Sequence, residues 1–236
     1  MTPQQALQQQ ATDMNIRLSQ AQLDQFDQYA RILRQWNEKM NLTAITDPME
    51  IVVKHFLDSL WLLRHLPVNQ KTKFIDVGTG AGFPALPIAI AVPGLCPVLL
   101  DSLNKRLVFL QAVCEALHLK ATFLHARAED AGRRPETRQQ FDIVTARAVA
   151  PLPQLCEYCM PFVKKGGLFA AMKGPDGKAE LDNAGAAIRK LGGAVKDVFS
   201  YSLSDGSSRT LIVIERISPL SPVYPRPTAK IKKEPL

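Results

Sequence analysis

The feature that most constrains the fold is a glycine-rich turn between a short apolar strand and a helix. Residues 74–77 are apolar apart from one acid and predict a buried strand. Three glycines follow directly, at Gly78, Gly80 and Gly82. Glycines let a backbone bend sharply and leave room for a ligand close to the main chain. The helix expected over 84–92 would point its free N–H groups at that ligand.

The rest of the chain alternates strands with helices. Residues 1 to about 70 predict helices, one capped by Ser19 and one beginning at Asp47-Pro48. Such alternation further along predicts a doubly wound, mostly parallel sheet. The last two strands leave no room for a helix between them and so predict an antiparallel edge pair. Strands are expected at 74–77, 97–101, 122–125, 141–145, 168–172, 195–201 and 210–215, and helices at 84–92, 103–119 and 179–191.

Acidic residues narrow the identity of the ligand. Asp101 ends the second strand, where a carboxylate can accept both ribose hydroxyls of a nucleoside. The loop has the spacing G-x-G-x-G rather than the dinucleotide pattern, and Asp76 precedes it. A carboxylate there would repel a pyrophosphate but favour the ammonium and sulfonium of S-adenosylmethionine. No Walker lysine follows, which argues against a nucleoside triphosphate. The pattern therefore predicts an S-adenosylmethionine site.

Other residues would complete that site. Ala128 and Glu129 follow the third strand, where the adenine ring would lie and its exocyclic amine could be bound. Asp130 beside them is better read as a solvated charge. Phe83 either packs against the ligand or fixes the loop to the core.

The residues after the fourth strand bear on the methyl acceptor. Neither an Asn-Pro-Pro-Tyr motif nor a cysteine nucleophile occurs there, so we expect an acceptor that is already nucleophilic, such as guanine N7. Catalysis would then rest on proximity and alignment, with no general base. Arg147 could position the purine edge or a phosphate, pair with Asp142, or contact the cofactor carboxylate. Cys156 and Cys159 lack a second pair, so no metal site is expected.

Composition bears on partners and location. Lys and Arg number 29 against 22 Asp and Glu, a net charge of +7 that suits a polyanion. No export signal or membrane-length apolar stretch occurs, so a cytoplasmic protein is expected.

His55 and Asp58 could form a wall of the acceptor cleft or belong to the core. Several polar and basic residues are expected to contact RNA; alternatively, they lie on solvated faces, cap a helix or belong to a disordered tail. They are Asn41, Lys105, Arg106, Lys173, Arg209, Arg226, Lys232 and Lys233.

Several motifs occur together in a fixed order. They are Trp36-Asn37, Asn41-Leu42-Thr43, His55 to Ser59, Phe74 to Gly82, Leu100 to Arg106 and Arg147-Ala148. This set resembles the RsmG (GidB) family of bacterial methyltransferases from about residue 20 to 216, and the basic ending is also similar. Ala85, where glycine is frequent in the family, and Thr145, where serine is commoner, are small departures.

The resemblance implies a Rossmann-like class I methyltransferase with a seven-stranded sheet and an N-terminal helical cap. It implies S-adenosylmethionine-dependent methylation of guanine N7 in 16S rRNA, at nucleotide 527 in the usual rRNA numbering. The cofactor residues that it implies are Gly78, Phe83 (commonly leucine in the family), Ala128, Glu129 and Arg147.

These inferences divide the chain into a helical region at 1–72, a cofactor-binding methyltransferase domain at 73–217 and an extended basic, proline-rich tail at 218–236. The expected partner is 16S rRNA or a small-subunit particle, and the expected state is a monomer. Two alternatives are a non-catalytic RNA-binding or ribosome assembly factor on the same fold and a nucleotide-dependent oxidoreductase.

Overall fold

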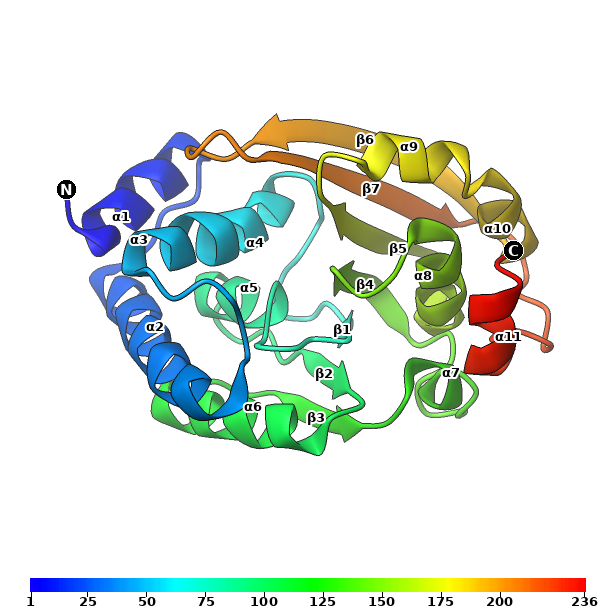
Figure 1. Ribbon diagram of the computed structural model, residues 1–236, viewed down its shortest axis with the longest axis horizontal. Helices are drawn as coiled ribbons and strands as arrows, with labels where there is room; N and C mark the ends of the chain where they lie inside the picture. The colour runs from blue at the N-terminus through cyan, green and yellow to red at the C-terminus, as the bar shows by residue number, and fades with distance from the viewer.

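One seven-stranded sheet runs through the whole molecule, with helices on both faces (Figure 1). The computed structural model describes residues 1–236. The strand order is β3-β2-β1-β4-β5-β7-β6, in which the first five strands are parallel and β7 is antiparallel to both its neighbours. This arrangement confirms the predicted parallel sheet with an antiparallel edge pair. The strands are β1 (Phe74–Val77), β2 (Val98–Asp101), β3 (Thr122–His125), β4 (Phe141–Arg147), β5 (Val163–Lys173), β6 (Gly193–Ser202) and β7 (Ser208–Arg216).

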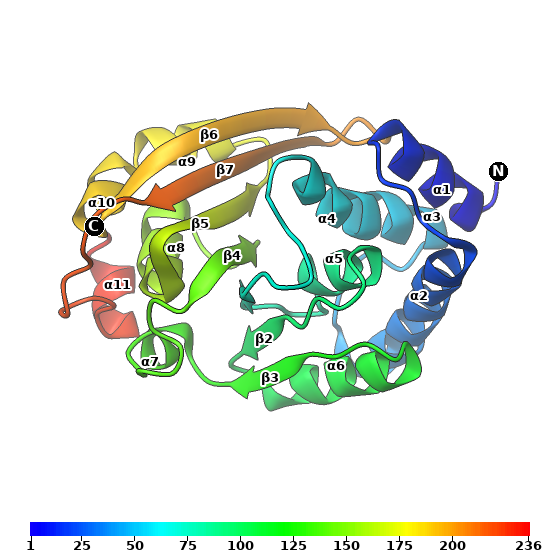
Figure 2. The same cartoon turned by 180° about the vertical axis from the view of Figure 1, so that it is seen from behind.

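The helices divide between the two faces of this sheet, as the opposite views in Figures 1 and 2 show. One face carries α1 (Pro3–Asp13), α2 (Gln20–Met40), α3 (Pro48–Ile51), α4 (Asp58–Leu60), α5 (Ala85–Ala91) and α6 (Asn104–Ala116). The other carries α7 (Ala128–Ala131), α8 (Leu152–Cys159), α9 (Gly177–Asp182), α10 (Gly185–Lys190) and α11 (Thr228–Lys233). Helix α3 continues into α4 through a π-helical segment, Val52–Leu57, and α4 ends in a 3-10 turn, Trp61–Arg64. No helix combines the length and apolar character needed to cross a bilayer.

Local sequence signals explain where the N-terminal helices begin. The Ser19 hydroxyl accepts a hydrogen bond from the backbone of Gln22, and the Gln22 side chain accepts one from the backbone of Ser19. This capping box satisfies two amides that the first turn of α2 would otherwise leave unpaired. The Asp47 carboxylate caps α3 by accepting hydrogen bonds from the backbone amides of Met49 and Glu50, and Pro48 lies in the first turn. Both helix starts are confirmed.

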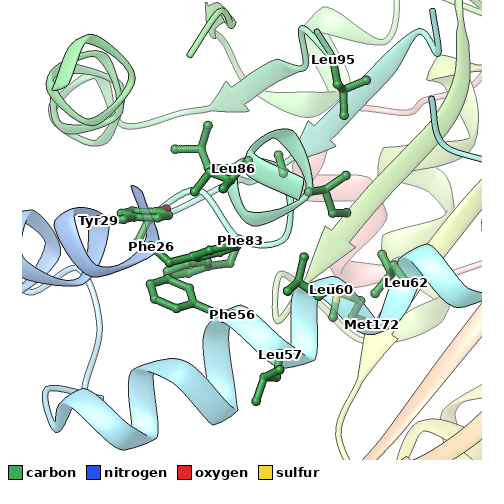
Figure 3. Packing of buried hydrophobic residues seen from close by; sticks show 14 of the residues in the cluster. Phe26, Tyr29, Phe56, Leu57, Leu60, Leu62, Phe83, Leu86, Leu95 and Met172 are labelled. Carbon is green, nitrogen blue, oxygen red and sulfur yellow. The ribbon is translucent and has the colours of Figure 1, made fainter. Parts of the chain in front are cut away.

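Successive side chains of a strand point to opposite faces of the sheet, so each face has its own hydrophobic core. In β5, Ala170 and Met172 join the core beneath α1–α6, whereas Phe169 and Ala171 join the core beneath α8 and α10. An aromatic cluster in the first core ties the N-terminal helices to the glycine turn (Figure 3). Its rings are Phe26, Tyr29, Phe56 and Phe83, with ring centroids 4.9 to 6.1 Å apart.

The structure differs from the sequence-based expectation in two elements. The helix expected over 179–191 is two short helices, α9 and α10, because Asn183 and Gly185 at their junction favour turns over helix. The expectation of an extended tail after 217 is wrong, since the segment ends in helix α11. Ile231 of that helix is fully buried, which explains why the tail packs rather than extends.

Candidate functional site

The glycine turn after β1 is shaped by backbone that only glycine adopts readily. Gly78 and Gly80 have φ of +69° and +59°, and the Gly78 amide donates to the Leu100 carbonyl over 2.9 Å. A Cβ at Gly78 would lie 2.8 Å from Cγ2 of Val149, on the loop after β4. The turn therefore requires glycine at 78 both for its dihedral angles and for the close approach of the two loops.

A cavity of about 380 Å³ opens at the carboxyl ends of β1, β2 and β4. Its volume falls within the range of about 300–1,000 Å³ typical of small-molecule sites. The cavity brings together four of the residues predicted to bind cofactor, namely Gly78, Asp101, Ala128 and Glu129. Two residues predicted to contact RNA, Arg106 and Lys232, also line it. Further lining residues, which no local sequence pattern marks, include Arg127, Gln154, Tyr158 and Thr228.

The Asp101 carboxylate is held in a fixed orientation at the edge of this cavity. One oxygen accepts the Gly80 amide over 3.0 Å and the Arg106 guanidinium over 3.3 Å. The other oxygen accepts the Leu103 amide over 2.9 Å. The same carboxylate therefore fixes the glycine turn and the start of α6, and it is a hydrogen-bond acceptor already placed where a ligand would sit.

Asp76 does not line the cavity, although its position in the sequence suggested a direct contact. Its side chain is fully buried behind the turn and accepts a hydrogen bond from the Thr145 hydroxyl over 2.7 Å. The second carboxylate oxygen has no protein partner. Burial raises the pKa of Asp76 to about 7, because it disfavours the charged form.

Gly82 and Phe83 lie on the core side of the turn rather than in the cavity. A Cβ at Gly82 would lie 2.5 Å from the Tyr29 hydroxyl, so this glycine serves the packing of α2. The Phe83 ring is buried and stacks on His55 with centroids 4.4 Å apart. Of the two interpretations of Phe83, the structure supports the one in which it fixes the turn to the core.

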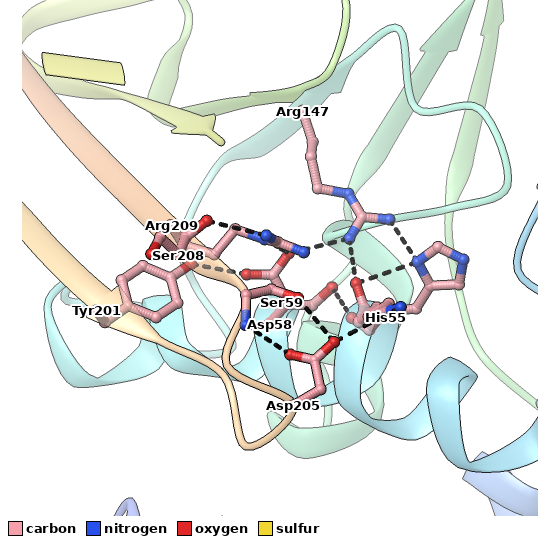
Figure 4. Close-up of polar contacts among 10 residues, drawn as sticks. His55, Asp58, Ser59, Arg147, Tyr201, Asp205, Ser208 and Arg209 are labelled. Carbon is pink, nitrogen blue, oxygen red and sulfur yellow. Dashed lines mark hydrogen bonds and ion pairs between the residues drawn. The ribbon is translucent and has the colours of Figure 1, made fainter. Parts of the chain in front are cut away.

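Arg147 ends β4 and points into a polar network with the N-terminal helices rather than into the cavity (Figure 4). Its guanidinium donates to the Lys54 carbonyl over 3.0 Å and to the Asp58 carboxylate over 3.2 Å. Lys54 lies in the π-helical segment between α3 and α4. The guanidinium carbon also lies 5.0 Å from the centre of the Phe83 ring. The suggested pairing with Asp142 is wrong, because that carboxylate pairs with Lys164.

His55 completes the network through both of its ring nitrogens. Nδ1 lies 3.1 Å from an Arg147 nitrogen and 3.2 Å from the Lys54 carbonyl oxygen. Nε2 lies 3.0 Å from the Thr43 hydroxyl. Burial, reinforced by the positive charge of Arg147, lowers the pKa of His55 to about 3. His55 is therefore neutral at physiological pH.

Asp58 joins this network to the far edge of the sheet. The Tyr201 hydroxyl of β6 donates to its carboxylate over 2.7 Å, and Arg209 of β7 lies 3.5 Å from the same group. Tyr201 was missed because nothing local marks it, and only the fold brings residues so distant in the chain together. The whole network therefore joins a helix, the end of β4 and the edge hairpin.

The remaining candidates for RNA contact fall into two groups. Asn41, Lys105 and Lys233 are exposed or nearly so, and Asn41 ends α2 with a φ of +48°. For Lys173 and Arg226 the prediction of RNA contact is corrected, because internal partners occupy both charges. Lys173 pairs with Glu180, and Arg226 pairs with the fully buried Glu157. Cys156 and Cys159 are residues of α8, and both are buried in the core.

Comparison with known proteins places this geometry in a family. The sequence pattern described as rRNA small subunit methyltransferase G matches residues 22–211. The chain belongs to the rRNA small subunit methyltransferase G family. It is 45% identical to the ribosomal RNA small subunit methyltransferase G of Alkaliphilus oremlandii, over 96% of this chain and 95% of the relative. It is also 45% identical to the protein of that name from Bacillus subtilis, over 95% of each.

Solved structures support the fold. An O-methyltransferase from Bacillus cereus, crystallised with SAH, superposes with a TM-score of 0.59 at 15% identity, covering 89% of this chain and 97% of that one. TrmN from Thermus thermophilus superposes with a TM-score of 0.53 at 20% identity, covering 70% and 53%. Family membership and this fold together confirm the resemblance drawn from the motifs, the class I methyltransferase fold and the methyltransferase class.

Proposed function

We propose that this chain transfers a methyl group from S-adenosylmethionine to N7 of a guanine in 16S rRNA, at nucleotide 527 in the usual rRNA numbering. The observation that carries the proposal is the cavity at the strand ends, which joins the Gly78 turn to the Asp101 carboxylate in a chain that belongs to this family. The substrate is 16S rRNA or a small-subunit particle, and the protein acts as a cytoplasmic monomer.

The residues present fit this cofactor. When bound, S-adenosylmethionine supplies a methyl group made electrophilic by a positively charged sulfur. Asp101 lies where a carboxylate accepts ribose hydroxyls, and Gly78 keeps the floor of the cavity free of side-chain atoms. Ala128 and Glu129 also line the cavity and would bind the adenine edge.

The protein's part in the reaction is to position groups and exclude water. Guanine N7 carries a free lone pair and has no proton to lose, so no residue needs to act as a general base. Holding such an acceptor in line with the methyl group removes most of the entropic barrier to transfer. Arg147, fixed by Asp58 and His55 at the end of β4, orients the edge of the acceptor site.

The basic side chains around the cavity support binding to RNA phosphates. Arg106 and Lys232 line it, Lys105 is exposed beside Arg106, and the chain carries a net charge of +7. Contacts of this kind give affinity without sequence specificity and weaken as salt is raised.

The decisive experiment compares 16S rRNA from cells with and without the gene by chemical cleavage at 7-methylguanine. We expect cleavage at nucleotide 527 only where the gene is present. Complementation with Gly78→Val should fail, because a side chain at 78 collides with Val149 and requires a strained φ. Gly174→Ala is the matched control, since its Cβ meets nothing within 4 Å.

Each alternative function makes a different prediction for the same experiment. A non-catalytic assembly factor would leave the rRNA unmethylated in every strain. An oxidoreductase would bind NAD in preference to S-adenosylmethionine in a titration of the purified protein.

A further inference from the structure

The C-terminal segment forms one wall of the cofactor cavity. Thr228 and Lys232 line the cavity from α11, the red helix beside α7 and α8 in Figure 1. These residues are one helical turn apart and so lie on the same face of α11. Gly78 of the glycine turn and Asp101 line the same cavity. The segment is therefore part of the site rather than an appendage to it.

A buried ion pair fixes this wall to the core. The Glu157 carboxylate of α8 is fully buried, and the Arg226 guanidinium binds both of its oxygens, with nitrogen–oxygen distances of 2.7 to 3.1 Å. The backbone amide of Arg226 donates to the same carboxylate over 2.8 Å. Bidentate contacts between an arginine and a carboxylate are stronger than hydrogen bonds between neutral groups. Removing one partner would leave a buried charge uncompensated.

Two further arginines hold the segment that leads to α11. Arg138 donates to the carbonyls of Tyr224 and Ser221 over 2.8 and 3.2 Å. Arg133 donates to the carbonyls of Val223 and Pro225. Together with the buried Ile231, these contacts fix the position of α11 over the cavity.

Thr228 connects the wall to a residue of the proposed site. Its hydroxyl donates to one carboxylate oxygen of Glu129, and this is the one side-chain hydrogen bond of that carboxylate. The orientation of the Glu129 carboxylate, which the proposed function places at the adenine edge, therefore depends on a single hydroxyl from the C-terminal segment.

We propose that Thr228 is a positioning residue for the cofactor and that it acts by fixing the carboxylate of Glu129. The inference rests on the proposed function, because it assigns Thr228 to the site of the same cofactor. It also assigns the C-terminal segment to cofactor binding, a role different from the RNA contact that its basic residues suggest.

The test is the dissociation constant of S-adenosylmethionine, measured by calorimetry on the full chain without RNA. Thr228→Val removes the hydroxyl at nearly constant shape, and Thr228→Ser keeps it. We expect affinity to fall about tenfold in Thr228→Val, the effect of losing one hydrogen bond to a charged group, and to stay within about twofold in Thr228→Ser. The thermal midpoint of the unliganded variants reports any structural damage separately.

A double-mutant cycle shows whether Thr228 acts through Glu129. In a Glu129→Gln background, Thr228→Val should weaken binding by much less than tenfold, because the group that it positions has already changed. Equal effects of Thr228→Val in both backgrounds would overturn the positioning role.

Further outcomes separate this inference from the proposed function. Wild-type protein that binds no S-adenosylmethionine contradicts the proposed function itself. Wild-type protein that binds it while Thr228→Val binds equally well contradicts only the inference. Should Thr228→Val fail to fold, Thr228→Ala is measured in the same way, and an affinity equal to that of the wild type would overturn the inference.

Discussion

Two buried ionisable side chains beside the glycine turn have pKa values displaced in opposite directions. His55 has its pKa lowered to about 3 and Asp76 has its pKa raised to about 7, in both cases mainly because burial disfavours the charged form. Near neutral pH His55 carries no charge, while Asp76 is partly protonated. The two groups therefore give the stability of the protein opposite dependences on pH.

His55 should make the protein less stable in mild acid. In the unfolded chain it gains a proton near pH 6.5, whereas in the folded protein it stays neutral down to about pH 3. The neutral His55 therefore costs the folded state no free energy of unfolding above about pH 6.5. Below that pH the free energy of unfolding declines as the pH falls toward 3. Between pH 7 and pH 5 we expect the wild type to lose about 2 kcal/mol more free energy of unfolding than His55→Asn. Urea unfolding at the two pH values measures this difference, and parallel losses would contradict it.

Asp76 should act in the opposite sense. The unfolded carboxyl loses its proton near pH 4, but the folded one keeps it until about pH 7, so stability declines as the pH rises through this window. Asp76→Asn removes the titration while keeping an oxygen that can accept from Thr145. The free energy of unfolding of this variant, relative to wild type, should rise by a few kcal/mol from pH 5 to pH 8. A constant difference across that range would show that Asp76 ionises normally.

At the scale of elements, the loop after β4 is held by a latch made of Lys173 and Glu180. The Lys173 ammonium donates to the Ala150 carbonyl and pairs with Glu180, each over 2.7 Å. Glu180 also accepts the Leu152 amide over 2.6 Å. The loop contains Ala148 at a φ of +54°, a conformation that needs support from its surroundings. The latch therefore holds a loop that lines the cavity.

Weakening the latch should slow methyl transfer. In Glu180→Gln we expect about a tenfold lower turnover of 16S rRNA, because a loop displaced by about 1 Å misaligns the acceptor. The control is Glu115→Gln, an exposed change on α6 with no ion pair to lose. Single-turnover rates measure the effect, and equal rates in the two variants would show that the latch serves stability alone.

The sequence predicts elements well where the signals are local. Every strand position, the Ser19 cap, the glycine turn and Asp101 depend on neighbours a few residues away, and all are found where expected. The Arg147 network could not be predicted, because it joins residue 147 to Asp58 and Tyr201, far apart in the chain. The packing of the tail was missed for the same reason, since its basic, proline-rich composition hides the partner at Glu157.

At the scale of the whole molecule, both tryptophans connect the N-terminal helices to the rest of the structure. Trp36 packs on Phe109 of α6 with ring centroids 5.7 Å apart, and Trp61 stacks on Tyr201 of β6 at 3.7 Å. The N-terminal helices also share one hydrophobic core with the sheet. We therefore propose that region 1–72 packs on the sheet as part of one cooperative unit.

Unfolding should accordingly occur in one transition. Tryptophan fluorescence reports the contacts of the N-terminal helices, and far-ultraviolet circular dichroism reports all helices and strands. The two midpoints should coincide in a urea titration. Separate midpoints would mean that the N-terminal helices unfold independently.

The proposed cofactor should stabilise this unit as a whole. At a concentration one hundred times its dissociation constant, a ligand that binds only the folded state adds about 2.7 kcal/mol. For a chain of this size, that amount corresponds to a rise in thermal midpoint of about 5–10 °C. Differential scanning fluorimetry with S-adenosylmethionine measures the shift. Gly78→Val should show none, and a shift of equal size in that variant would place the ligand elsewhere.

The segment that leads to α11, residues 218–227, is rich in proline, and this composition decides how it can pack on a protein built around a sheet. Proline has no amide hydrogen, so this stretch offers its neighbours mainly carbonyl oxygens and cannot pair with an open strand edge as an added strand. Arg133 and Arg138 match it with donors alone. A segment of this composition thus lies over a binding site without adding a strand to the sheet. Replacing either arginine with lysine would exchange a planar guanidinium for a single ammonium.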